Sequence, residues 1–112
     1  MRNYSLIRQV RDHIVANPNE HNQDQWGIRT PCKTTHCAAG HAVIIAGARP
    51  IWEVNGDHYQ MYGAEWRNRR WSTGELAQHL LGLTDDEADE LFYGFDDAGA
   101  LDMLDRFVKE GE

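Results

Sequence analysis

The segment from Ala38 to Gly47 constrains the fold of this chain most strongly, because nearly all of its side chains are small or branched and apolar. A helix made of such residues has no polar face for water, so other elements must surround it. Its alanines and glycines let neighbouring backbones approach closely. Thr34 or Thr35 can cap this helix and Gly47 can end it. We therefore expect a buried central helix here.

This segment and its flank also carry the atom types of a zinc site, in Cys32, His36, Cys37 and His41. Structural zinc takes four ligands in a tetrahedron. On a helix, Cys37 and His41 are four residues apart and share a face, whereas His36 is turned by about 100° from Cys37. Only Cys32, Cys37 and His41 can bind one zinc ion together, and this segment has no adjacent fourth ligand. Close packing is the preferred interpretation and no cofactor is assigned; a small zinc-binding domain through these three residues is the alternative.

Redox or nucleophilic chemistry is a third interpretation of the two cysteines. Cys37 falls in the first turn of the expected helix, where the amide dipoles stabilise a thiolate. However, Cys32 and Cys37 lack the Cys-x-x-Cys spacing of redox proteins, and thiols stay reduced in a cytoplasm. No Ser-His-Asp pattern or glycine-rich phosphate loop is recognisable in the sequence. The sequence therefore predicts no catalytic residue and a protein that is not an enzyme.

Four further helices are predicted by apolar periodicity and by capping residues. Apolar side chains recur at helical spacing within residues 6–15, after a possible cap at Ser5. Residues 72–75 and 84–87 both have the capping-box sequence, in which a hydroxyl and a glutamate bind each other's backbone amides. The last helix follows an aspartate at position 96 or 97.

One β-hairpin is predicted at about residues 51–61, where the hydrophobic period changes to two on both sides of Asn55-Gly56. With Asn55-Gly56 as a two-residue turn, Trp52 would pair with Tyr59. One face of the hairpin would then be buried. Its side chains are those of Trp52, Val54, Tyr59 and Met61.

These elements together define the expected fold. Residues 19–31 are polar and irregular, so we expect a loop anchored by the indole of Trp26. The chain of 112 residues is the size of one domain. The expected fold class is mainly α: a single domain, 1–112, with about five short helices around one core and one β-hairpin.

The charge of the chain is distributed unevenly. Residues 1–83 contain nine Lys and Arg against seven Asp and Glu, whereas residues 84–112 contain two against eleven. An acidic C-terminus and a net charge of −7 disfavour nucleic acid as a partner. The acidic residues are either solvated helix faces or a surface for a basic partner. No apolar run approaches the roughly 20 residues that span a membrane, and a cytoplasmic protein without a membrane partner is expected.

The one basic cluster is residues 66–71, in which three arginines lie between two tryptophans. Its candidate partner-binding residues are Trp66, Arg67, Arg69, Arg70 and Trp71. The preferred interpretation is that these arginines pair with the acidic C-terminal block. If they are exposed, they suit a protein interface, where Trp and Arg contribute most of the affinity, or stacking on nucleic-acid bases.

Residues 78–83 weakly resemble the peptides by which bacterial proteins dock on the replication clamp. Such peptides bind in an extended conformation, whereas this segment has the pattern of a helix end with core leucines. A replication-clamp binder is therefore a minor alternative.

The sequence contains Cys-x-Thr-x-x-Cys-x-Ala-Gly-His-Ala at 32–42, together with Asn22-Gln23, Trp26, Leu81–Thr84, Glu87-Ala88 and Leu91-Phe92. These motifs resemble those of a family of small uncharacterised proteins of actinobacteria and their phages, of the mycobacteriophage type. The resemblance implies a phage-type accessory protein in the cytoplasm of a bacterial host. The function expected from it is binding and perturbing a host protein.

Overall fold

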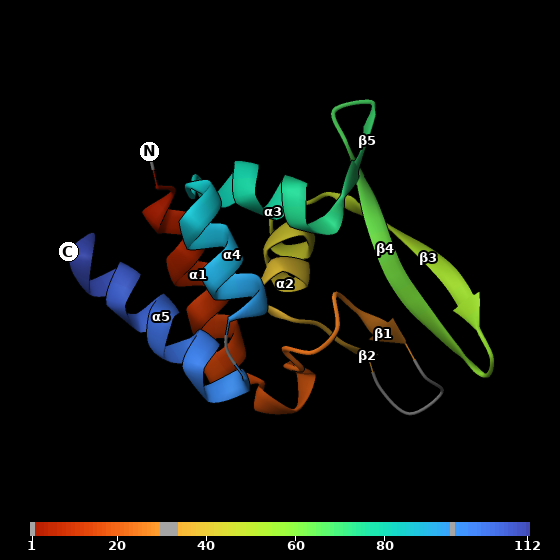
Figure 1. Ribbon diagram of the computed structural model, residues 1–112, viewed down its shortest axis with the longest axis horizontal. Helices are drawn as coiled ribbons and strands as arrows, with labels where there is room; N and C mark the ends of the chain where they lie inside the picture. Colours follow the sequence, from red (N-terminus) through yellow and green to blue (C-terminus); the bar gives the residue numbers. More distant parts are fainter. Residues whose placement is uncertain (1, 30–33, 95) are drawn as a thin grey trace.

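The computed structural model describes residues 2–29, 34–94 and 96–112. The first half of the chain contains the elements α1 (Tyr4–Ala16), the 3-10 helix η1 (Pro18–Glu20), β1 (Ile28–Arg29), β2 (Thr34–Thr35), α2 (Ala38–Ile45) and β3 (Arg49–Asn55). The second half contains β4 (His58–Trp66), β5 (Arg69–Ser72), α3 (Thr73–Leu81), α4 (Asp85–Tyr93) and α5 (Asp97–Glu110). The α-helices gather on one side of the molecule and the sheet extends from them on the other (Figure 1).

The prediction of a mainly α fold with one hairpin is wrong, because the described residues form a five-stranded antiparallel sheet beside five α-helices. The sheet has the order β2-β1-β4-β3, and β5 pairs with β4 beside β1. β4 is the common partner, since β1, β3 and β5 all bond to it. The fold class is therefore α+β.

The predicted hairpin exists with a different register. Its two-residue connection is Gly56-Asp57, and Gly56 has φ +65°, the positive value that a type II′ turn needs at its first position. Trp52 consequently pairs with Met61, and not with Tyr59. The shift moves the pairing partner by two residues, so the predicted set of side chains still shares one face.

Only part of that face is buried, which contradicts the prediction. Met61 is buried and Trp52 packs partly against the core, but Val54 is 65% exposed and Tyr59 46% exposed. These two residues lie near the outer end of the hairpin, which extends beyond the helices (Figure 1). The alternating pattern identified the strands but not how far the helices cover them.

A second hairpin, β4 to β5, occupies the basic cluster and was not predicted as strand. Its turn residues Arg67 and Asn68 have φ values of 52° and 64°, the two positive values that define a type I′ turn. Trp66 pairs with Arg69 and Ala64 with Trp71. Arginine is uncommon at a positive φ, so the usual turn signal is missing from the sequence.

The expectation of a buried central helix is confirmed. Residues 38–43 of α2 are all buried. The helix begins later than predicted, because Cys37 is its N-cap and Thr34 and Thr35 form β2. Gly47 follows the helix with φ +92°, as expected of a C-terminal stop.

The other helix starts agree with the capping analysis except at α1. Ser72, Thr84 and Asp96 each accept a backbone N–H as N-cap, and Thr84 with Glu87 completes a capping box. In α1 the cap is Asn3, whose side chain accepts from Leu6 N–H, and not Ser5. Of the described helices, none is long and apolar enough to cross a membrane.

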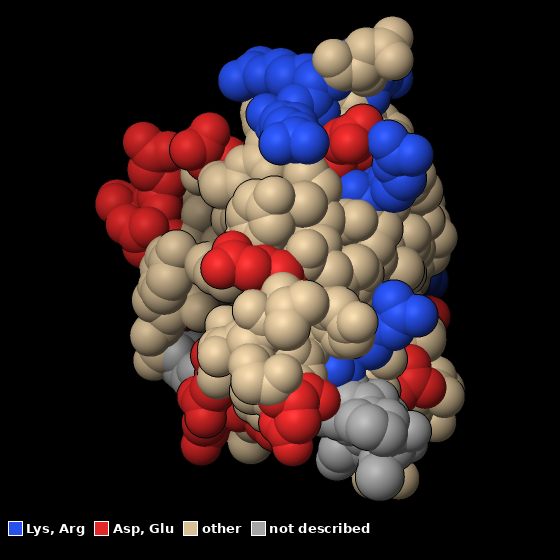
Figure 2. Space-filling view, turned by 90° about the vertical axis from the view of Figure 1, so that its right-hand side faces the viewer, with Lys and Arg blue, Asp and Glu red and all other residues tan. Residues whose placement is uncertain are grey.

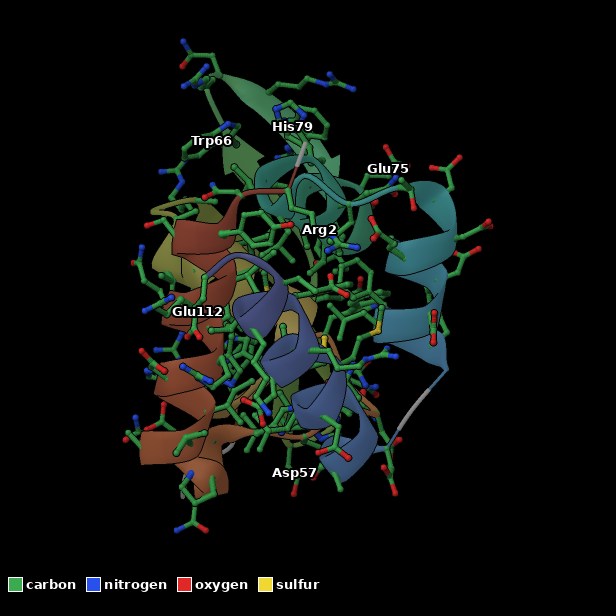
Figure 3. All side chains as sticks on the ribbon, turned by 90° about the vertical axis from the view of Figure 1, so that its left-hand side faces the viewer. Arg2, Asp57, Trp66, Glu75, His79 and Glu112 are labelled. Carbon is green, nitrogen blue, oxygen red and sulfur yellow. The ribbon has the colours of Figure 1, made fainter. Side chains whose placement is uncertain are left out.

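The acidic C-terminal helices are held by arginines of α1 and its flank. Arg2 binds Glu87 of α4 and Glu110 of α5, and its guanidinium lies 4.2 Å from the centre of the Phe107 ring. Arg11 binds Asp105 at 2.9 Å. Arg2 thus joins three helices at one end of the molecule (Figure 3).

We predict that Gly40→Ala destabilises the protein, because a methyl group on Gly40 would lie 1.9 Å from the backbone oxygen of Trp26. Such overpacking costs about 2 kcal/mol or more, since backbone must move. Denaturant unfolding monitored by circular dichroism measures the loss.

The matched control is Gly74→Ala in α3, where the added methyl group would meet only the edge of the Trp26 indole at 3.2 Å. It should cost clearly less than Gly40→Ala. Equal losses for the two variants would contradict a specific backbone contact at Gly40.

Candidate functional site

The candidate partner-binding residues all lie on the β4–β5 hairpin, residues 66–71, which we call the arginine–tryptophan hairpin. The hairpin projects from the sheet next to α3 (Figure 1). Arg67, Arg69 and Arg70 are exposed. Figure 2 shows Lys and Arg side chains gathered at the top of the view, with acidic side chains beside them, in the centre and along the left and lower edges.

Cation–π contacts and stacking order the aromatic side chains of the hairpin. The Arg69 guanidinium lies 3.9 Å from the ring centre of Trp71. His79 of α3 stacks on Trp71 as well, with 5.3 Å between ring centroids and 21° between planes. Arg67 lies 5.3 Å from the Trp66 ring centre. These contacts place flat cationic groups on an ordered aromatic base.

The preferred sequence interpretation of this cluster, ion pairing with the acidic C-terminal block, is wrong. Among the residues that the structure describes, no carboxylate pairs with Arg67, Arg69 or Arg70. The acidic block pairs chiefly with α1 and its flank instead, through contacts such as Arg2–Glu87 and Arg11–Asp105. Three guanidinium groups of the hairpin are therefore available for other partners.

Of the two cysteines, Cys37 is the one that the structure describes, and it lies in the core. Cys37 is buried, and the Gly40 N–H donates to its Sγ at 3.5 Å. Burial raises the pKa of the Cys37 thiol to about 11. Cys32 lies outside the described residues, so neither the cysteine pair nor the proposed ligand set with His41 can be placed. Cys37 itself is a protonated, inaccessible thiol.

A cluster of four histidines was missed by the sequence analysis, which considered His36 and His41 only as ligands. The ring centroid of His41 lies 5.0 Å from that of His13, 5.2 Å from His36 and 6.3 Å from His21. His36 and His41 belong to the stretch that the sequence singles out, but His13 and His21 come from earlier segments with no characteristic spacing to it. Among residues 2–29, 34–94 and 96–112, no three His, Cys, Asp or Glu side chains are arranged to hold a metal ion.

Burial favours the neutral form of His41 and of His36. His41 donates from Nε2 to the Glu20 carbonyl oxygen at 2.9 Å. Burial, followed by the charge of His36, lowers the pKa of His41 to about 3. Burial also lowers the pKa of His36, whose Nε2 is buried without a hydrogen-bond partner among the described groups. Protonation of either ring therefore opposes folding.

The segment that resembles a clamp-binding peptide is part of the core. Gln78 and Leu81 belong to α3, and Leu81 and Leu83 are buried. Gln78 Nε2 donates to Asp85 Oδ1 at 2.7 Å. The pattern of a helix end with core leucines is confirmed, and an extended docking conformation is not available to it in this fold.

Comparison with known protein families, with curated proteins and with solved structures gives no match. The resemblance to actinobacterial phage proteins consequently stays a prediction. Function is therefore inferred from the geometry of the arginine–tryptophan hairpin.

We predict that the free energy of unfolding decreases as the pH falls from about 6.5 towards 3. The unfolded chain takes up a proton at His41 near the ordinary histidine pKa of 6.5, whereas the folded chain does so only near 3. The unfolded state binds more protons between these values, so stability rises with pH in this window. At pH 4 the loss is on the order of 3 kcal/mol.

Urea unfolding at several pH values measures this dependence. His41→Gln should flatten it, because glutamine can donate to Glu20 without titrating. His58→Gln, at the tip of the first hairpin, is the matched control and should retain the slope of the original protein. An unchanged slope in His41→Gln would contradict the assignment.

We also predict that Cys37 does not react with iodoacetamide in the folded protein at pH 8, because its thiol is buried and protonated. It should react once the chain is unfolded in urea. Trypsin cleaves after Lys33, between the two cysteines, so mass spectrometry of the peptides reports on Cys37 alone. Rapid modification of Cys37 in the folded protein would support the redox interpretation instead.

Proposed function

We propose that this chain is a small phage-type accessory protein that binds and perturbs a host protein in the bacterial cytoplasm, without catalysis. The arginine–tryptophan hairpin is the docking surface, and an acidic surface of the host protein is its target. The observation that carries the proposal is the set of three exposed arginines without carboxylate partners among the described residues, two of which lie over tryptophan rings.

The preorganisation of the hairpin favours a binding role. A type I′ turn fixes the backbone at Arg67-Asn68, and the β4 pairing fixes both tryptophans. The Arg69 side chain is already ordered over Trp71, so less conformational entropy is lost when a partner binds. Arginine and tryptophan are the side chains that most often dominate interface affinity.

A protein partner fits the charge of the whole chain better than nucleic acid does. The net charge is −7, and the hairpin contributes only three positive charges. Nucleic-acid binding depends on the release of counterions by many cationic contacts. An acidic patch on a protein requires only a few guanidinium contacts, and guanidinium forms bidentate pairs with carboxylates.

We predict that Arg67→Ala/Arg69→Ala/Arg70→Ala loses the specific host partner and retains the fold. Tagged protein is used to capture partners from a bacterial host lysate, and quantitative mass spectrometry compares the variant with the original chain. The main partner should fall at least about tenfold, because central arginines of an interface are typical hot spots.

The matched control is Arg8→Ala/Arg106→Ala/Lys109→Ala, which removes three positive charges from α1 and α5. It should retain the partner, since exposed ion pairs contribute little to stability. Equal loss in both variants would refute docking by the hairpin. Fluorescence anisotropy with labelled single-stranded and duplex DNA is the second test. If the original chain binds DNA and the hairpin variant does not, a nucleic-acid function replaces the proposal.

A further inference from the structure

A groove lies beside the Trp26 indole, lined by residues of α4, of the start of α3 and of the sheet. Three adjoining hollows of about 380, 190 and 260 Å³ share Trp26 in their walls. The first extends to the start of α3 and the third to β3 and β4. We call this surface the Trp26 groove.

The walls of the Trp26 groove are largely aromatic. Phe92 and Tyr93 of α4 contact Trp26 edge to face, at centroid distances of 6.1 Å and 5.5 Å. Tyr93 is 69% exposed, and Tyr62 is 49% exposed on the opposite wall. Tyr62 is the extra residue at the β-bulge of β4, where Ile51 pairs with Gly63 and Trp52 with Met61. The bulge therefore directs an aromatic side chain towards this surface.

The charges around the groove are all of one sign. Four acidic side chains line it, those of Asp24, Glu53, Glu75 and Asp89. No Lys or Arg among the described residues does so. These four carboxylates are also exposed, and none pairs with a described basic residue. They differ in this respect from Glu87 and Asp105, which α1 and its flank neutralise.

We propose that the Trp26 groove binds an extended, arginine-rich segment of a partner protein. Guanidinium groups stack on aromatic faces and form bidentate pairs with carboxylates, so one side chain satisfies both features of the walls. An extended segment presents such side chains along a groove, whereas a single small ligand would fill only one hollow. This site is separate from the arginine–tryptophan hairpin, whose target is acidic.

Fluorescein-labelled nona-arginine is the probe, and fluorescence anisotropy at low salt gives its Kd. Glu75→Gln/Asp89→Asn should weaken binding by about tenfold or more, because both carboxylates line the largest hollow. The matched control, Asp102→Asn/Glu112→Gln, makes the same change of net charge on α5 and its end. It should change the Kd by less than about twofold.

A second pair of variants tests the aromatic wall. Tyr62→Ala should weaken binding of nona-arginine several-fold. Tyr59→Ala removes a similarly exposed tyrosine from the same strand, outside the groove, and should leave the Kd unchanged. Circular dichroism checks that all variants are folded.

Two results would overturn the proposal. Equal weakening by the groove variants and by their matched controls would mean that the peptide responds only to net charge. The other comes from sedimentation velocity. If the original chain is a dimer and Glu75→Gln/Asp89→Asn makes it a monomer, the groove binds a second copy of this chain. The hairpin is tested by capture of a host partner and the groove by binding of nona-arginine, so the two proposals fail independently.

Discussion

The burial of α2 is the constraint on which the rest of the structure depends. Residues 38–43 have no exposed face, so α1, α3 and the sheet must all pack around one short helix. The buried side chain of Gln23 joins this helix to its surroundings. Its Oε1 accepts from Ala38 N–H at 3.1 Å, and its Nε2 donates to the Leu91 carbonyl at 2.9 Å. A single amide thus connects the start of α2 with α4.

Local signals in the sequence were sufficient for most helices. The caps at Ser72, Thr84 and Asp96 depend on residues within one turn, and they are where the sequence places them. The small side chains of α2 likewise predicted its burial. Strands were harder to predict, because β5 has four residues, most of them charged or polar, and its turn at Arg67-Asn68 lacks the usual glycine.

The candidate sites were predictable in composition and not in arrangement. Residues 66–71 are recognisable as a cluster from their types alone. That their arginines form no ion pairs with the described carboxylates depends on which other arginines reach the acidic helices. Arg11 does so because α1 packs against α5, and Arg2, which precedes α1, reaches both α4 and α5. The histidine cluster and the Trp26 groove combine side chains from distant segments. Neither has a fixed spacing that a sequence could display.

β4 is the strand from which both candidate surfaces are built. It carries Tyr62 at its bulge and Trp66 at its end, and it pairs with three other strands. An insertion or deletion within it would move both surfaces together and reverse which side chains face the core. An insertion or deletion in the turns Gly56-Asp57 or Arg67-Asn68 would not shift the strand register in this way, because these residues lie outside the strand pairing. Evolutionary change in binding specificity is therefore easiest at the turns and at surface side chains, and most restricted in the strand itself.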